Sequence, residues 1–206
     1  CLAQEGQDRE QMAYVLMRKS NVASDLGRGR EALDLAEAAL EAGADLSPQS
    51  RAAILRQRAL GHSLEGGRKE CMVDLAAASD ALTRVRCVDD RASYVTQGYI
   101  ASEGALCLLH LGTPSAGEAI LRPRLTTWPE DVRRDRGHAL ARLAVAVVSG
   151  GQLEEGVEFL NQAAAIARPT ASARLRSEVK RVGQLLPAKT GVAKVDEVKA
   201  AVAALP

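Results

Sequence analysis

Aromatic residues are scarce in this sequence of 206 residues, which contains one Phe, one Trp and three Tyr although 47% of its residues are hydrophobic. Sheets are enriched in aromatic and β-branched residues, whereas Ala and Leu favour helices. The shortage of rings therefore argues against a sheet and favours closely packed helices with a core of Ala, Leu and Val. It also leaves few of the aromatic anchors that dominate tight protein interfaces.

The sequence also lacks a long apolar run and an excess of charge of either sign. Its longest apolar stretch, LARLAVAVV at 140–148, contains Arg142 and is far shorter than the roughly 20 residues that span a bilayer. The first ten residues, CLAQEGQDRE, are polar and carry no secretory signal. The 27 basic and 26 acidic residues leave a formal net charge of +1, which argues against a dominant nucleic-acid-binding face. We expect a cytoplasmic protein that contacts neither a membrane nor nucleic acid directly.

Reactive and metal-binding side chains form no recognised pattern. The cysteines have no CxxC spacing and no His at ligand spacing, and the histidines lie in three separate segments. These residues are Cys1, Cys71, Cys87 and Cys107, and His62, His110 and His138. The sequence has no P-loop, no GxGxxG and no nucleophile elbow. We therefore predict no enzyme activity, no metal site and no cofactor, with the thiols reduced.

Helix signals follow one another along the chain, separated by short breaks that contain Gly or Pro. Apolar residues recur close to the helical period of 3.6, and no segment alternates at period two. Asp89 or Asp90 is the predicted cap of the fifth helix, and Pro123 is expected to shorten or kink the sixth. The predicted helices cover 11–26, 30–43, 48–65, 68–85, 91–111, 116–125, 130–149, 152–167, 170–186 and 192–205. This pattern predicts an all-α fold.

The breaks recur at similar intervals, and a small residue follows each break at the same distance. These small residues are Ala32, Cys71, Gly117 and Gly156, which are 39, 46 and 39 residues apart. Seven residues further on, three of the four units have Ala39, Ala78 and Ala163, whereas the third has Arg124. Helix pairs that recur at about 40 residues are typical of an α-solenoid, because small residues let antiparallel helices approach closely. An ordinary alanine-rich helical bundle is the alternative.

These positions resemble the tetratricopeptide repeat (TPR), whose pattern has small residues at its eighth, twentieth and twenty-seventh positions. The matching residues are Ser20, Ala32 and Ala39, then Ala59, Cys71 and Ala78, and finally Ala144, Gly156 and Ala163. The resemblance implies about four antiparallel helix pairs over residues 1–169, followed by capping helices over 170–206. The polar face that a capping helix needs explains the basic run of Arg174, Arg176, Lys180 and Arg181.

The stretch 133–186 is similar to the end of the sensor domain in actinobacterial regulators that carry an XRE-type helix-turn-helix. Those domains finish with an Arg-Asp-Arg helix, a repeat hairpin and a Ser-x-Arg helix, which correspond here to 134–136 and 172–174. No helix-turn-helix is visible in these 206 residues. The resemblance therefore implies the sensing part of a transcriptional regulator, without its DNA-binding part.

In the TPR family the first helix of each pair lines a concave groove, which implies a set of candidate binding residues. Asn21 could bind a peptide backbone, and Arg56 and Arg142 could each bind a carboxylate bidentately. Apolar residues such as Leu60, Leu106 and Val145 share this face, so it is either a groove for a peptide or lipid-like ligand or a face closed by neighbouring helices. The candidate residues are Tyr14, Met17, Asn21, Asp25, Arg56, Ser63, Tyr99, Glu103, His110, His138 and Arg142.

Two functional hypotheses follow. In the first, a peptide or small signalling molecule binds the groove and alters the curvature of the repeats or a dimer contact, which requires different affinities for two states. In the second, the chain is a stand-alone TPR adaptor that binds a protein partner or a second copy of itself as a homodimer. Both describe a binding protein without catalytic chemistry.

Overall fold

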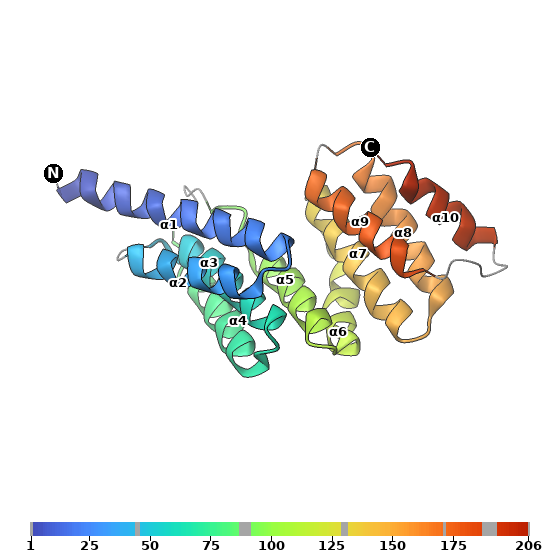
Figure 1. Ribbon diagram of the computed structural model, residues 1–206, viewed down its shortest axis with the longest axis horizontal. Coiled ribbons are helices and arrows are strands. Elements are labelled where there is room, and N and C mark those ends of the chain that lie inside the picture. Colours follow the sequence, from blue (N-terminus) through green and yellow to red (C-terminus); the bar gives the residue numbers. More distant parts are fainter. Residues whose placement is uncertain are drawn as a thin grey trace. The chain divides into compact units, whose positions relative to one another are not determined.

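The computed structural model describes residues 2–43, 46–86, 92–128, 132–170, 172–186 and 193–205, and within these ranges it contains helices and turns but no strand (Figure 1). The prediction of an all-α fold is confirmed. The helices are α1 (Leu2–Asp25), α2 (Gly29–Ala42), α3 (Pro48–Leu64), α4 (Arg68–Leu82), α5 (Gln97–His110), α6 (Pro114–Leu125), α7 (Arg133–Ser149), α8 (Leu153–Ala167), α9 (Ala173–Leu185) and α10 (Ala193–Ala203).

Most helices begin and end near the predicted breaks, but two begin elsewhere. α1 begins at Leu2, well before residue 11, because the polar start of the chain is rich in the helix formers Gln and Glu. The predicted start of the fifth helix at 91 is wrong. The Thr96 side chain accepts a hydrogen bond from the Tyr99 amide at 3.1 Å, so α5 begins only at Gln97. The proposed caps at 89 and 90 lie outside the described residues.

Four turns between consecutive helices share one backbone conformation. Each contains a glycine in the left-handed region, where a side chain would be strained, and the next helix begins two residues later. The glycine φ angles are 73° at Gly27, 78° at Gly66, 69° at Gly112 and 86° at Gly151. The intervening residues have φ from −120° to −74° and ψ from 65° to 73°. The same turn therefore recurs at the breaks that the sequence alignment identified.

The first compact unit, Cys1–Leu111, contains α1 to α5. α3 packs against α1, α2, α4 and α5, and α2 also packs against α1. Because α3 has neighbours on several sides, its residues 52–57 are buried without interruption. Gly61 permits the contact with α2, since a Cβ at this position would lie 2.8 Å from Leu33 Cγ.

The second unit, Gly112–Pro206, contains α6 to α10. α7 packs against α6, α8 and α9, and α10 packs against α8 and α9. Its core includes the fully buried Leu140, Leu160 and Leu175. The predicted boundary between repeats and capping helices lies inside this unit, between α8 and α9. That prediction concerns which helices belong to repeats, whereas the division at 111/112 separates packed groups.

The small residues of the repeat alignment all lie in the interior. Ser20 also links two helices directly, because its hydroxyl donates a hydrogen bond of 2.7 Å to the Ala32 carbonyl of α2. The buried set is Ser20, Ala32, Ala39, Ala59, Cys71, Ala78, Ala144, Gly156 and Ala163. In the described part of the chain, no helix combines the length and the apolar character needed to cross a bilayer.

Candidate functional site

The structure places most of the predicted groove residues in the interior, on the first helices of the predicted pairs. Only Asp25 and His110 are exposed, and Tyr14 and Tyr99 are half-buried. The others are buried: Met17, Asn21, Arg56, Ser63, Glu103, His138 and Arg142. The structure brings them together in three groups, which are Arg56 with Tyr99 and Glu103, Ser63 with His110, and His138 with Arg142.

The first group surrounds the fully buried guanidinium of Arg56 on α3. Its Nη1 lies 3.2 Å from the Glu103 carboxylate of α5, and its Nη2 donates a hydrogen bond to the Tyr99 hydroxyl. The guanidinium also lies 5.2 Å from the centre of the Tyr99 ring, within the range of a cation–π interaction. A buried charge is tolerated only when it is paired and hydrogen-bonded. This group therefore fixes α3 against α5.

Gln57 extends the same polar network toward α1. It accepts a hydrogen bond from Arg56 Nη1, and its amide nitrogen donates to Ser24 Oγ at 3.0 Å. Ser24 Oγ donates in turn to the Ser20 carbonyl at 3.0 Å. A continuous polar path therefore runs from α5 through α3 to α1. Gln57 and Ser24 were not predicted, because the predicted groove residues form one stripe on each helix, whereas the structure also buries positions beside that stripe.

Some buried polar atoms in this unit keep unused hydrogen-bonding capacity. Within the described residues, Asn21 Oδ1, Arg56 Nε and Tyr94 Oη have no hydrogen-bond partner. Asn21 is 8% exposed. A buried acceptor without a partner costs free energy, which a ligand that donates a hydrogen bond would recover.

The group of His138 and Arg142 joins α7 to α9 in the second unit. The carboxylate of Glu178 accepts a hydrogen bond of 3.0 Å from Arg142 Nε and is also hydrogen-bonded to His138 Nδ1. Burial raises the pKa of Glu178, but Arg142, His138 and Arg174 together lower it further, so that the pKa falls to about 2. Glu178 is consequently ionised at neutral pH and cannot act as a general acid.

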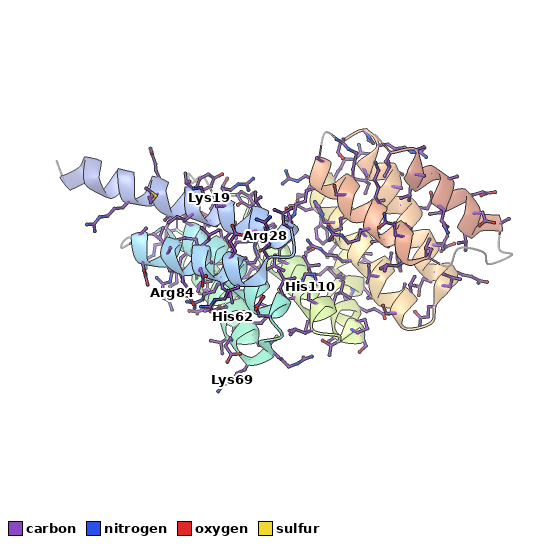
Figure 2. All side chains as sticks on the ribbon, viewed as in Figure 1. Lys19, Arg28, His62, Lys69, Arg84 and His110 are labelled. Atoms are coloured by element: carbon purple, nitrogen blue, oxygen red, sulfur yellow. The ribbon has the colours of Figure 1, made fainter. Side chains whose placement is uncertain are left out.

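A further charged group, outside the predicted set, joins α3 to α4. Arg58 holds the buried Asp74 bidentately, with distances of 2.8 and 2.6 Å. His62 Nε2 lies 3.7 Å from the same carboxylate (Figure 2 labels His62). The hydrogen bond to Asp74 raises the pKa of Arg58 above its ordinary value.

The sequence contains a signal for these buried acids that the prediction of the groove residues did not use. Asp74, Glu103 and Glu178 each occupy the second place of a buried i, i+3, i+4, i+7 stripe. The stripes are Cys71, Asp74, Leu75 and Ala78; Ile100, Glu103, Gly104 and Cys107; and Leu175, Glu178, Val179 and Val182, in which only Glu178 is partly exposed. An acid within an apolar stripe requires a counter-charge, and each of these acids has an Arg on a neighbouring helix.

Ser63 and His110 form a polar contact beside a pair of buried thiols. Ser63 Oγ lies 3.3 Å from His110 Nδ1, but its own proton is donated to the Leu60 carbonyl at 2.8 Å. With its proton directed to Leu60, Ser63 is not oriented to give that proton to His110, as a nucleophile activated by a base would be. Cys71 and Cys107 are buried and hydrogen-bonded to each other, and this bond together with burial raises the pKa of Cys107 well above its ordinary value.

The charged residues described above hold neighbouring helices together through ion pairs. Among the described side chains, no cluster of three or more His, Cys, Asp or Glu could hold a metal ion. A scan against protein-family models, a search of curated proteins and a search of solved structures each returned no match. The function must therefore be inferred from the geometry of this chain.

Proposed function

We propose that the chain is a TPR-like α-solenoid of about four antiparallel helix pairs, with α9 and α10 as capping helices, that serves as a sensing and interaction domain. The recurring glycine turn carries this proposal. The same glycine conformation at Gly27, Gly66, Gly112 and Gly151 recurs with intervals of 39, 46 and 39 residues, and each is followed by a helix at the same distance. A bundle without repeats has no reason to reuse one turn at regular intervals.

In this proposal, a peptide or small signalling molecule binds the first helices of the pairs, as in the sensor domain of an XRE-type regulator. Among the described residues, Asn21 Oδ1 on α1 is buried without a hydrogen-bond partner, which supports a polar contact between this atom and the ligand. The network from Ser24 through Gln57 and Arg56 to Glu103 connects α1, α3 and α5. A ligand on one of these helices would therefore favour one arrangement of all three, provided it binds the two arrangements with different affinities.

A thermal-shift screen with pools of short peptides and small metabolites tests this proposal. We expect at least one pool to raise the melting temperature, since a ligand that binds only the folded state stabilises it. Asn21→Ala should abolish that shift, whereas Asn161→Ala, at an exposed Asn of α8, should preserve it. Flat responses across all pools, or an unchanged response of Asn21→Ala, would contradict the proposed site.

The alternative function is a cytoplasmic adaptor that binds a protein partner or forms a homodimer. It is favoured by exposed apolar residues of α1 and of the turn that follows it, which include Val22 at 60% and Leu26 at 61%. The free thiols of Cys71 and Cys107 suit a reducing compartment. Size-exclusion chromatography with light scattering distinguishes the two functions. A dimer whose mass does not respond to peptides favours the adaptor, whereas a monomer with a peptide response favours the sensor.

A further inference from the structure

The outer face of α1 carries a regular stripe of exposed apolar side chains. Met12, Val15 and Val22 of α1 are 55%, 46% and 60% exposed, and Leu26, directly after the last residue of α1, is 61% exposed. Leu26 continues the last helical turn, because its amide donates a hydrogen bond of 3.1 Å to the Val22 carbonyl. Together with Lys19 they occupy positions 12, 15, 19, 22 and 26, which alternate in spacing between three and four residues. In a helix of 3.6 residues per turn these positions lie within an arc of about 80°. We call this set the α1 stripe.

The inner face of α1 is already occupied. Ala13, Met17 and Ser20 are buried against the rest of the first unit, where α1 packs on α2 and α3. The α1 stripe lies on the other side of the same helix. Exposed apolar side chains scattered singly are normal, but a contiguous set indicates an interaction surface. Spacings of three and four over two heptads are those with which one helix contacts another helix.

The charges beside the stripe indicate what kind of helix would bind. Arg9, Arg18 and Lys19 are exposed on α1, and among its described side chains Asp25 is the only exposed acid. Within the described residues no carboxylate forms an ion pair with Arg18 or Lys19 (Figure 2 labels Lys19). Lys19 lies at the centre of the stripe. A second copy that paired in parallel would place two Lys19 ammonium groups opposite each other, which is unfavourable. A helix with carboxylates beside its own apolar face would pair with these cations instead.

We propose that the α1 stripe is a docking surface for an acidic amphipathic helix. The apolar residues of the partner cover Met12, Val15, Val22 and Leu26. The aliphatic part of Lys19 lies between Val15 and Val22, while its ammonium reaches a carboxylate at the edge of the interface. This inference goes beyond the proposed function, because Asn21 lies on the buried side of α1 and the stripe on its exposed side.

Two labelled peptides of about three heptads test the proposal, since this is the length over which a helical pair becomes well defined. Their Leu/Ile faces are identical, but one carries Glu and the other Lys at the flanking positions. Fluorescence anisotropy with the full chain should show the Glu peptide binding at least about tenfold more tightly than the Lys peptide. The preference should weaken at high salt, which screens exposed charges. Equal binding of both peptides would overturn the charge argument.

Variants of the chain locate the site. Val22→Asp should weaken binding of the Glu peptide by at least about tenfold, because a charge would enter the apolar contact. The matched control is Val73→Asp on α4, where the side chain is 59% exposed, against 60% for Val22, and where binding should be unchanged. Lys19→Glu should reverse the preference between the two peptides. All three sites are exposed, so circular dichroism should show unchanged folding.

The remaining outcomes are also decisive. If neither peptide binds, or if Val22→Asp binds as well as the unmodified chain, the α1 stripe is not a docking surface for an acidic helix. If light scattering shows a dimer that Val22→Asp dissociates, a second copy is the occupant and the proposal fails. A thermal response to short peptides that depends on Asn21 should persist in Val22→Asp, so the proposed function and this inference can fail separately.

Discussion

Glu178 provides the sharpest test of the interactions that hold the second unit together. Its side chain is 15% exposed and is the carboxylate partner of both His138 and Arg142. Its pKa falls from an ordinary value of 4.5 to about 2 in the folded chain. Each unit of pKa difference corresponds to about 1.4 kcal/mol, so the ionised carboxylate contributes on the order of 3 kcal/mol to the free energy of unfolding. Glu178→Gln removes this contribution and leaves Arg142 buried without a counter-charge.

The contribution of Glu178 to the free energy of unfolding should decrease as the pH falls. Because the folded pKa lies below the unfolded one, the contribution is complete above about pH 4.5 and is lost as the pH falls toward 2. At pH 3 about 2 kcal/mol of it should already be lost, since the unfolded chain then binds a proton that the folded chain does not. The difference in unfolding free energy between the unmodified chain and Glu178→Gln should therefore shrink by about 2 kcal/mol between pH 7 and pH 3.

Urea denaturation followed by Trp fluorescence measures this difference. The single Trp of the chain is Trp128, which belongs to the second unit, so its fluorescence reports the unit that contains Glu178. Glu197→Gln, at an exposed Glu of α10, is the matched control and should change stability by less than about 0.5 kcal/mol. The reasoning is refuted if Glu178→Gln behaves like this control at pH 7, or if the difference between the two chains is the same at both pH values.

Three further predictions concern the first unit. Glu103→Gln should destabilise it by about 3 kcal/mol, because Arg56 then stays buried without a carboxylate, and urea denaturation followed by circular dichroism measures the loss. Gly66→Ala should lower the stability by about 1 kcal/mol, because a residue with a side chain is strained at the φ of 78° found there. The added Cβ would meet nothing within 4 Å, so no new contact offsets this strain. In a chain with Ser at positions 1 and 87, Cys71 and Cys107 should react with a thiol reagent only as fast as the unit opens, because both are buried.

Each of these predictions has its own control. Combining Glu103→Gln with Arg56→Met should restore most of the lost stability, because no buried charge remains. If Glu103→Gln alone lowers the stability less than the double variant does, the buried charge of Arg56 is not the cause of the loss. Gly67→Ala, at the N-cap of α4, should cost less than Gly66→Ala, because φ is −74° there and the nearest atom to an added Cβ is the end of the flexible Glu70 side chain at 3.3 Å. Equal costs at Gly66 and Gly67 would show that the turn does not require the left-handed conformation. Labelling of the thiols as fast as free cysteine would show that they are accessible.

The positions of the helices could be predicted because glycine and proline act locally. A Gly in the left-handed region or a Pro in a first turn ends or begins a helix whatever surrounds it. The start of α5 was missed because Ala92 and Val95 continue the apolar period although they lie outside a helix. Both are buried, so burial alone produced a pattern that resembled a helix.

The charged groups could be predicted only in part. Arg56, Glu103, His138 and Arg142 were found because they share one face of their helices, but the pattern could not show that this face is covered. Glu178 was missed because its partners lie 36 and 40 residues earlier in the chain. Which Arg pairs with which acid depends on how neighbouring helices are staggered, and single-helix periodicity contains no information on that. The position of each acid within an apolar stripe is the local signal that remains.

The glycine turns also have a practical consequence for engineering the chain. Gly27, Gly66, Gly112 and Gly151 are exposed, and a side chain at any of them would point into open space. Extra residues inserted there would enter solvent, and the entropic cost of a longer loop grows only slowly with its length. Affinity tags, fluorophores or whole reporter proteins could therefore be fused into the middle of the chain at these places, where grafts at the crowded helix crossings would not fold.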